Sequence, residues 1–249
     1  MSLQACAEIV RRGDPDRFLA AMAAPPGARR VLFPLYAFNV EVARAPWVTE
    51  EPMIAEMRLQ WWRDALDEIA RGGPVRRHDV VDALAGVLDG QGAGLLDRLI
   101  QARRWDIYRD PFEDDHHFDA YLEATAGGLA VAAARALGAR DGEAAIRDVA
   151  WAGGLANWFL ALPELEVRGR VPLVDGRAEA VAALAGQGLA RLRRGKPPRR
   201  ARAALLATWR ARGILKRACR APRRVADGTL GGSEFARRSG LILRSLGLA

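Results

Sequence analysis

Asp106 and Asp110 form a pair of carboxylates spaced four residues apart. If a helix continued through both, the two side chains would share one face, and paired carboxylates can bind a hard cation such as Mg²⁺. Pro111 follows directly and favours a helix end at this point, and arginines lie on both sides of the pair. The pattern therefore fits either a metal or substrate contact or a salt-bridged helix end, and both interpretations stay open.

A second group of metal-binding residue types is Asp114-Asp115-His116-His117. Adjacent residues on a helix point in different directions and no distal ligand is evident, so the alternative is an acidic helix N-terminus. Gly127-Gly128 and Gly153-Gly154 follow no strand and are predicted to be sites of close helix packing rather than a dinucleotide loop. The motifs of serine hydrolases, zinc proteases and P-loop proteins do not occur.

The elements that would position these residues are helices. No segment keeps the alternation of a half-buried strand, whereas helical spacing and helix-capping residues recur, so we expect an all-α protein. Asp14 before Pro15 is typical of a helix start. The helices are predicted at 15–22, 28–44, between 49 and 72, and at 79–88, 95–109, 116–137 and 143–162, with a loop over 163–175.

One predicted helix carries a clear apolar stripe. Between Thr49 and Gly72, apolar residues recur at helical spacing, and we expect this stripe to face the core. Its members are Ile54, Met57, Trp61, Ala65 and Ile69.

Four segments of the chain occur in an order that resembles the squalene/phytoene synthase family. They are Leu35-Tyr36-Ala37-Phe38, Leu59-Gln60-Trp61-Trp62-Arg63-Asp64-Ala65-Leu66, Asp106-Ile107-Tyr108 with Tyr121 and Ala126-Gly127, and Arg168-Gly169-Arg170-Val171-Pro172-Leu173. The resemblance spans roughly residues 31–173. It implies a single helical bundle of the class I isoprenoid (terpenoid) synthase type over residues 1–249, with a divergent, arginine-rich last third from about residue 190.

In the family that the chain resembles, two pairs of aspartates hold Mg²⁺ ions that neutralise a prenyl diphosphate. The matching positions here are Ala43 or Arg44 with Trp47 for the first pair, and Ala161 with Leu165 for the second. Both pairs are replaced. The resemblance therefore implies a pseudoenzyme that has no metal ligands, no catalytic residue that can be assigned and no cofactor.

The resemblance and the remaining polar residues give candidates for a remnant substrate cavity. Each of them could equally have a structural role in the fold. The candidates are Tyr36, Glu41, Arg44, Asp106, Asp110, Tyr121, Asn157, Glu164, Arg168 and Arg170.

Two functions follow from the resemblance. The branch of the family without aspartate pairs includes the mitochondrial assembly factor of respiratory complex I, which implies a non-catalytic binding or assembly protein. Its partners would be complex I subunits or another protein, and its cavity could retain a prenyl or quinone-like lipid. The alternative is an active head-to-head prenyl transferase that acts on farnesyl or geranylgeranyl diphosphate, with Glu41, Asp106, Asp110 and Glu164 as altered Mg²⁺ ligands.

Composition adds further expectations. Only two cysteines occur, in no metal-binding or redox pattern, and no secretory signal or spanning stretch is evident, so we expect a cytoplasmic protein that could lie peripherally at the inner face of a membrane. The net charge of +8 is carried almost wholly by arginine. Aromatic residues are sparse among the C-terminal arginines, which disfavours nucleic acid and leaves an anionic membrane surface or an acidic protein as a partner.

Overall fold

The computed structural model describes residues 2–245, and it describes no side chain at 234–238 or at 243. Every regular element in this part of the chain is helical, which confirms the all-α prediction. The α-helices are α1 (Ser2–Gly13), α2 (Pro15–Ala23), α3 (Pro26–Arg44), α4 (Pro52–Arg71), α5 (Asp79–Ala85), α6 (Gly90–Arg103), α7 (Asp115–Leu122), α8 (Gly128–Ala136), α9 (Glu143–Val167), α10 (Ala178–Arg194), α11 (Arg202–Leu205), α12 (Ala211–Arg220), α13 (Arg223–Ala226) and α14 (Glu234–Ser245).

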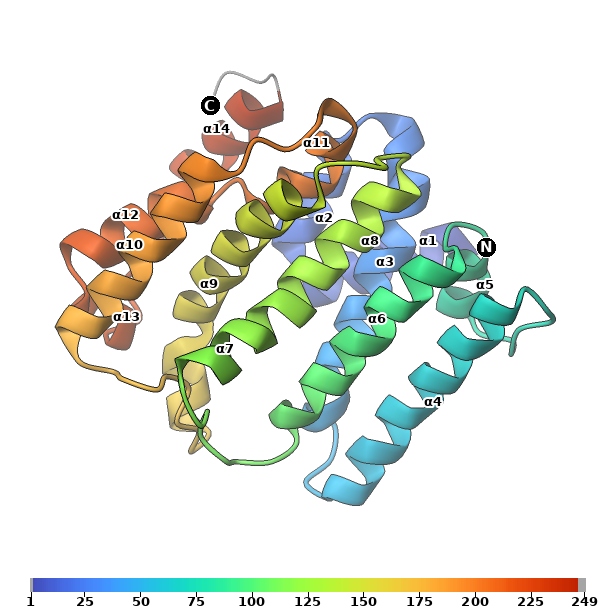
Figure 1. Cartoon of the computed structure of the whole chain (residues 1–249), viewed down its shortest axis with the longest axis horizontal. Helices are drawn as coiled ribbons and strands as arrows, with labels where there is room; N and C mark the ends of the chain where they lie inside the picture. Colours follow the sequence, from blue (N-terminus) through green and yellow to red (C-terminus); the bar gives the residue numbers. More distant parts are fainter. Residues whose placement is uncertain (1, 246–249) are drawn as a thin grey trace.

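The long helices lie side by side, with α4 at one edge and α10 and α12 at the other (Figure 1). Between them, α6 packs against α4 and α8, and α9 packs against α8 and α10. Helices α7 and α8 form one continuous run through the π-helical segment Glu123–Gly127. Short 3₁₀ segments extend α3 (Ala45–Trp47) and α6 (Arg104–Asp106). Within residues 2–245, no helix combines the length and the apolarity needed to cross a membrane.

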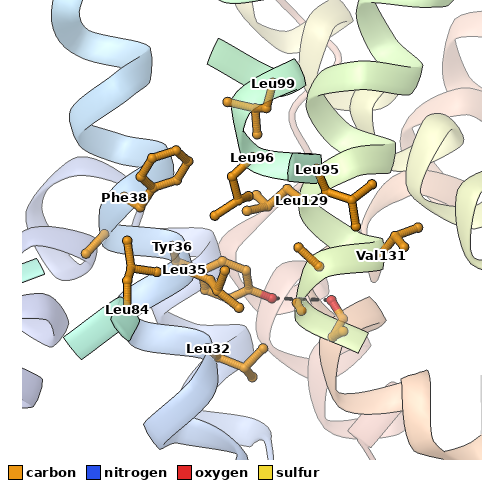
Figure 2. Packing of buried hydrophobic residues seen from close by; sticks show 14 of the residues in the cluster. Leu32, Leu35, Tyr36, Phe38, Leu84, Leu95, Leu96, Leu99, Leu129 and Val131 are labelled. Atoms are coloured by element: carbon orange, nitrogen blue, oxygen red, sulfur yellow. Dashed lines mark hydrogen bonds between the residues drawn. The ribbon is translucent and has the colours of Figure 1, made fainter. Parts of the chain in front are cut away.

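Buried apolar side chains form two clusters. The first lies around α3, where Leu32, Leu35 and Phe38 pack against leucines of α5, α6 and α8 (Figure 2). The second surrounds α9, where Trp151 and other α9 side chains meet α7, α10 and α12. The prediction of one domain over residues 1–249 stays a prediction, and residues 1 and 246–249 lie outside the described part of the chain.

Helix α9 is longer than predicted. The sequence predicted an end at Leu162, but the helix continues through Pro163 to Val167. Proline removes one backbone hydrogen-bond donor from the helix. Burial of Leu162 nevertheless holds this part of the helix against the core, and the Arg168 amide closes the last turn by donating to the Glu164 carbonyl at 3.1 Å. The predicted loop therefore begins at the end of α9 and not at Pro163.

The predicted apolar stripe of α4 is only partly correct. Ala65 and Ile69 are buried as expected, but Ile54 and Met57 are 42% and 66% exposed. The buried face instead begins with Ala55 and continues through Leu59, Trp62 and Leu66. Because α4 is an edge helix, only the side that packs on its neighbours is covered (Figure 1).

The two cysteines should differ sharply in reactivity. Cys6 is fully buried, and burial, with a smaller contribution from Asp79, raises the pKa of its thiol to about 11, whereas Cys219 is exposed. The thiolate is the reactive form. At pH 8 we expect a thiol reagent to label one cysteine in the folded protein and the second only after unfolding. Equal labelling of both thiols before unfolding would contradict the buried position of Cys6.

Two glycines of α9 mark close helix contacts, as predicted. A Cβ at Gly153 would lie 2.6 Å from Thr208 Cγ2, and a Cβ at Gly154 would lie 2.6 Å from Ala126 Cβ. Gly127 and Gly128 are less constrained, because the nearest contacts of an added Cβ are at 3.2 Å and 3.4 Å.

The substitution Gly154→Ala is expected to lower the free energy of unfolding by about 1–3 kcal/mol, because a methyl group would overpack the contact between α9 and the π-helical segment. Gly186→Ala is the matched control. It lies within α10, and an added Cβ there meets nothing within 4 Å, so this change should stabilise the protein by about 0.5–1 kcal/mol. Urea unfolding of both variants tests the difference. An unchanged free energy of unfolding in Gly154→Ala would show that the helices can move apart without losing stability.

Candidate functional site

An open cavity of about 310 Å³ lies between α3, the end of α6, the α7–α8 run and α9. Its wall combines apolar side chains with three arginines and two carboxylates. The lining residues are Arg17, Asn39, Ala43, Trp47, Arg103, Asp106, Tyr121, Leu122, Thr125, Ala126, Gly154, Asn157, Trp158, Ala161, Glu164, Leu165 and Arg168. A larger hollow of about 730 Å³ shares five of these residues and extends towards α1 and Arg44.

The family resemblance places the first aspartate pair at Ala43 or Arg44 with Trp47 and the second pair at Ala161 with Leu165. Ala43, Trp47, Ala161 and Leu165 line this cavity, whereas Arg44 lines only the neighbouring hollow. Ala43 and Trp47 come from the end of α3 and the 3₁₀ turn that follows, and Ala161 and Leu165 come from the last turns of α9. They lie one helical turn apart on each element, which is why each pair reaches the same space. The side chains at these four positions are apolar.

Two arginine side chains lie over the Trp47 ring. The Arg168 guanidinium carbon lies 4.7 Å from the centroid of the Trp47 ring, and that of Arg170 lies 5.5 Å from the same ring. Cation–π contacts of this kind stabilise an arginine over an indole. At these positions the cavity presents aromatic and cationic groups.

Asp106 belongs to a buried polar triad. Its carboxylate accepts hydrogen bonds from Arg103 Nη1 at 2.9 Å and from the Tyr121 hydroxyl at 2.8 Å, and Arg103 Nη1 also donates to the Tyr121 oxygen at 2.8 Å. Asp106 and Tyr121 are both nearly fully buried. Burial raises the pKa of Tyr121 well above its ordinary value, while Arg103 acts in the opposite direction. The three side chains thus hold one another in place through mutual hydrogen bonds.

Arg170 supports this triad from the loop after α9. It is buried, and its guanidinium donates to the backbone carbonyls of Trp105, at 3.4 Å, and of Asp106. Burial lowers the pKa of Arg170, and the charge of Asp106 partly offsets this effect. Arg170 thus fixes the backbone turn that carries Asp106.

Asp110 does not join Asp106. The predicted helix over 95–109 is α6, which ends at Arg103, and a 3₁₀ turn ends at Asp106, so Asp110 lies in an exposed loop. The two carboxylates cannot share a helical face. The sequence left two interpretations open for this pair, a metal or substrate contact and a salt-bridged helix end. Asp106 fits the second, because it forms an ion pair with Arg103 just after the end of α6.

The other predicted site residues are placed as follows. Asn157, Glu164 and Arg168 line the cavity, and Glu164 pairs with Arg168 at 2.6 Å. Tyr36 is buried in the first cluster, where its hydroxyl donates to the Ala204 carbonyl at 3.3 Å (Figure 2).

Glu41 and Arg44 lie outside the 310 Å³ cavity. Glu41 pairs with Arg44 at 3.2 Å, and Arg44 lines the neighbouring hollow. Asp114 caps α7 by accepting from the His117 amide at 2.7 Å, as the helix N-terminus interpretation predicted.

Several lining residues were missed by the sequence analysis. Arg17 comes from α2, Asn39 from α3 and Arg103 from α6, and each reaches the cavity only through packing between distant segments. Thr125 lies in the π-helical segment, a feature that is frequent at functional sites. Two of the missed residues could have been found from the sequence. Trp158 adjoins Asn157 in a segment marked by the family resemblance, and Arg103 is one of the arginines beside Asp106.

The donor set does not suit a cluster of Mg²⁺ ions. The carboxylates of the cavity wall are Asp106 and Glu164, and each is already paired with an arginine. Magnesium requires several oxygen ligands in octahedral geometry. Across the described residues, no three histidine, cysteine, aspartate or glutamate side chains gather where they could hold a metal ion.

The fold and the cavity between its helices define an all-α protein of the isoprenoid synthase fold. A family model for squalene/phytoene synthase matches residues 10–228, and the chain belongs to this family. A crystal structure of a dehydrosqualene synthase in complex with ligand superposes with a TM-score of 0.80 at 16% identity, covering 99% of this chain and 96% of that one. At this identity the likeness concerns the fold.

Sequence relatives carry a different description. A Drosophila melanogaster protein described as a homolog of NADH dehydrogenase (ubiquinone) complex I, assembly factor 6, is 30% identical over 64% of this chain and 50% of its own length. The Bos taurus assembly factor 6 is 26% identical over 67% of this chain and 51% of its own length. The chain thus spans about half the length of the curated relatives it matches.

Proposed function

We propose that this chain is a non-catalytic member of its family that acts in the assembly of respiratory complex I. The observation that carries the proposal is the cavity wall. Where a synthase of this family would need aspartates, the side chains are Ala43 or Arg44, Trp47, Ala161 and Leu165, and all of these except Arg44 line the cavity. The relatives are described as complex I assembly factors, which supports assembly as the function of a family member without catalysis.

The chemistry of the cavity supports a binding function. Ionisation of an allylic diphosphate creates a carbocation and a highly charged leaving group, and metal ions normally stabilise that charge. Asp106 is held in a buried ion pair with Arg103, and Glu164 forms a more exposed pair with Arg168, so the cavity wall offers two carboxylates rather than the several oxygen ligands that magnesium requires. Without that stabilisation, the apolar part of the wall is suited to hold a prenyl or quinone-like chain without converting it.

The partners in this proposal are subunits of complex I, and the place of action is the inner face of the membrane in which that complex is built. The chain would work there as a peripheral protein made in the cytoplasm. The cavity would serve as a sensor or holder of a lipid during assembly and would not be a reaction centre.

Deletion of the gene tests the assembly role. We expect less fully assembled complex I on native gels and a matching loss of NADH:quinone oxidoreductase activity, with succinate dehydrogenase unchanged as the control. The wild-type chain should restore both signals. Normal amounts of assembled complex in the deletion strain would exclude the proposed role and would return attention to a prenyl transferase.

A further inference from the structure

Basic and acidic residues are separated along this chain. Residues 191–249 hold 17 of the 38 lysines and arginines but only two of the 30 aspartates and glutamates. The preceding residues therefore contain more acidic than basic side chains. The net charge of +8 arises from the last quarter of the sequence.

Helix α12 displays part of this charge as one stripe. Its apolar side, with Ile214 and Leu215, is buried against α9 and α10. The opposite side exposes Arg212, Lys216 and Arg220. These residues are spaced four apart, so they lie in a row about 12 Å long on one face of the helix.

Two further arginines extend the stripe. Arg202 is exposed at the start of α11. Burial contributes most to lowering the pKa of Arg244, and the charges of Arg212 and Arg202 lower it further. Arg223 is exposed just beyond the other end of the helix. We call the row of Arg202, Arg212, Lys216, Arg220 and Arg223 the basic ridge.

The basic ridge has no evident partner within the fold. Other arginines of the last third are bound to carboxylates, as Arg191 is to Asp119 at 2.6 Å and Arg194 is to Asp148 at 2.5 Å. Among the side chains that the structure describes, which exclude those of 234–238 and 243, the five ridge residues form no ion pair of this kind. Their charge is therefore available to another molecule.

The chemistry of the ridge favours a protein over a lipid bilayer. Helices that bind membranes insert exposed apolar side chains, but the apolar side of α12 is buried in the fold. Among the side chains described in 191–245, Ile242 on α14 is the large apolar one that is strongly exposed. Arginine also binds carboxylates bidentately. A row of fixed cations about 6 Å apart matches carboxylates repeated every four residues on a helix.

We propose that the basic ridge is a docking surface for an acidic helical segment of a partner protein, with aspartate or glutamate at every fourth position. This inference does not depend on a role in complex I assembly. It concerns a surface on α12, remote in sequence from the residues that line the cavity.

The test uses a synthetic helical peptide with glutamate at every fourth position, and the same peptide with glutamine as the reference. Binding to the purified chain is measured by fluorescence anisotropy at 50 and 200 mM salt. We expect the glutamate peptide to bind at low salt, to weaken clearly at 200 mM salt, and to bind far better than the glutamine peptide.

Two variants with the same change in net charge locate the site. The ridge variant carries Arg212→Gln, Lys216→Gln and Arg220→Gln, and the control carries Arg30→Gln, Arg58→Gln and Arg77→Gln, which are exposed arginines of other elements. We expect the ridge variant to lose about tenfold in affinity for the peptide, because it loses three exposed ion pairs with the peptide glutamates. The affinity of the control should stay within about twofold of the wild type. Circular dichroism confirms that both variants are folded.

Three outcomes would overturn the proposal. One is the absence of binding at 50 mM salt. A second is an equal loss in both variants, because the attraction would then reflect net charge and not the ridge. The third is ridge-dependent binding to phosphatidylserine-containing vesicles without binding to the peptide, which would identify a membrane surface as the partner.

Discussion

Replacing Asp106 with alanine is expected to lower the free energy of unfolding by about 3–5 kcal/mol. The carboxylate accepts hydrogen bonds from Arg103 and Tyr121 in a buried site, so its removal leaves a guanidinium charge without a counterion. Breaking a buried ion pair in this way costs far more than removing a surface pair. Urea or thermal unfolding of the purified variant measures the loss.

Asp110→Ala is the matched control for this change. Asp110 is a nearby carboxylate in an exposed loop, so its removal should alter stability by less than about 0.5 kcal/mol. If Asp106→Ala instead keeps its stability and abolishes a magnesium-dependent turnover of the wild-type chain, Asp106 is a ligand and not a structural residue. The pair of variants thus separates the two interpretations that the sequence left open.

Replacing Trp158 with alanine should be about equally severe, with a loss of about 3–5 kcal/mol. The Trp158 ring contacts the rings of Trp105, Phe112, Phe118 and Tyr121, with centroids 5.3–5.9 Å apart. Its removal would leave a large void beside the cavity. Chemical unfolding of the variant gives the cost directly.

Trp158→Phe separates packing from hydrogen bonding at this position. Trp158 Nε1 donates to the Pro172 carbonyl at 2.8 Å, which ties the loop after α9 to the cavity wall. Phenylalanine would keep most ring contacts and lose that bond, so we expect a smaller loss of about 1–2 kcal/mol. Equal losses in the two variants would mean that the hydrogen bond, and not the aromatic cluster, holds the site.

Local patterns predicted much of this fold. Asp14 accepts from the Arg17 amide at the start of α2, as a capping residue before proline should. Asp114 likewise accepts from the His117 amide at the start of α7. These features depend on residues close in sequence, which is why they could be predicted without a structure.

Features that depend on tertiary packing could not be predicted in this way. Arg17 reaches the cavity because α2 packs against α3, and nothing in its own segment signals this. Helix α6 ends at Arg103, and the 3₁₀ turn that follows it is held by Arg170 from a distant loop. Continuation of α9 through Pro163 likewise reflects burial of Leu162, which outweighs the local preference of proline.

Diphosphate release from farnesyl and geranylgeranyl diphosphate, measured with the purified chain and Mg²⁺, tests the central claim most directly. A family synthase with both aspartate pairs serves as the positive control. We expect no release above background from this chain, because its cavity carboxylates are bound to arginines. Release that exceeds background and disappears on chelation would contradict the claim and would identify an active prenyl transferase.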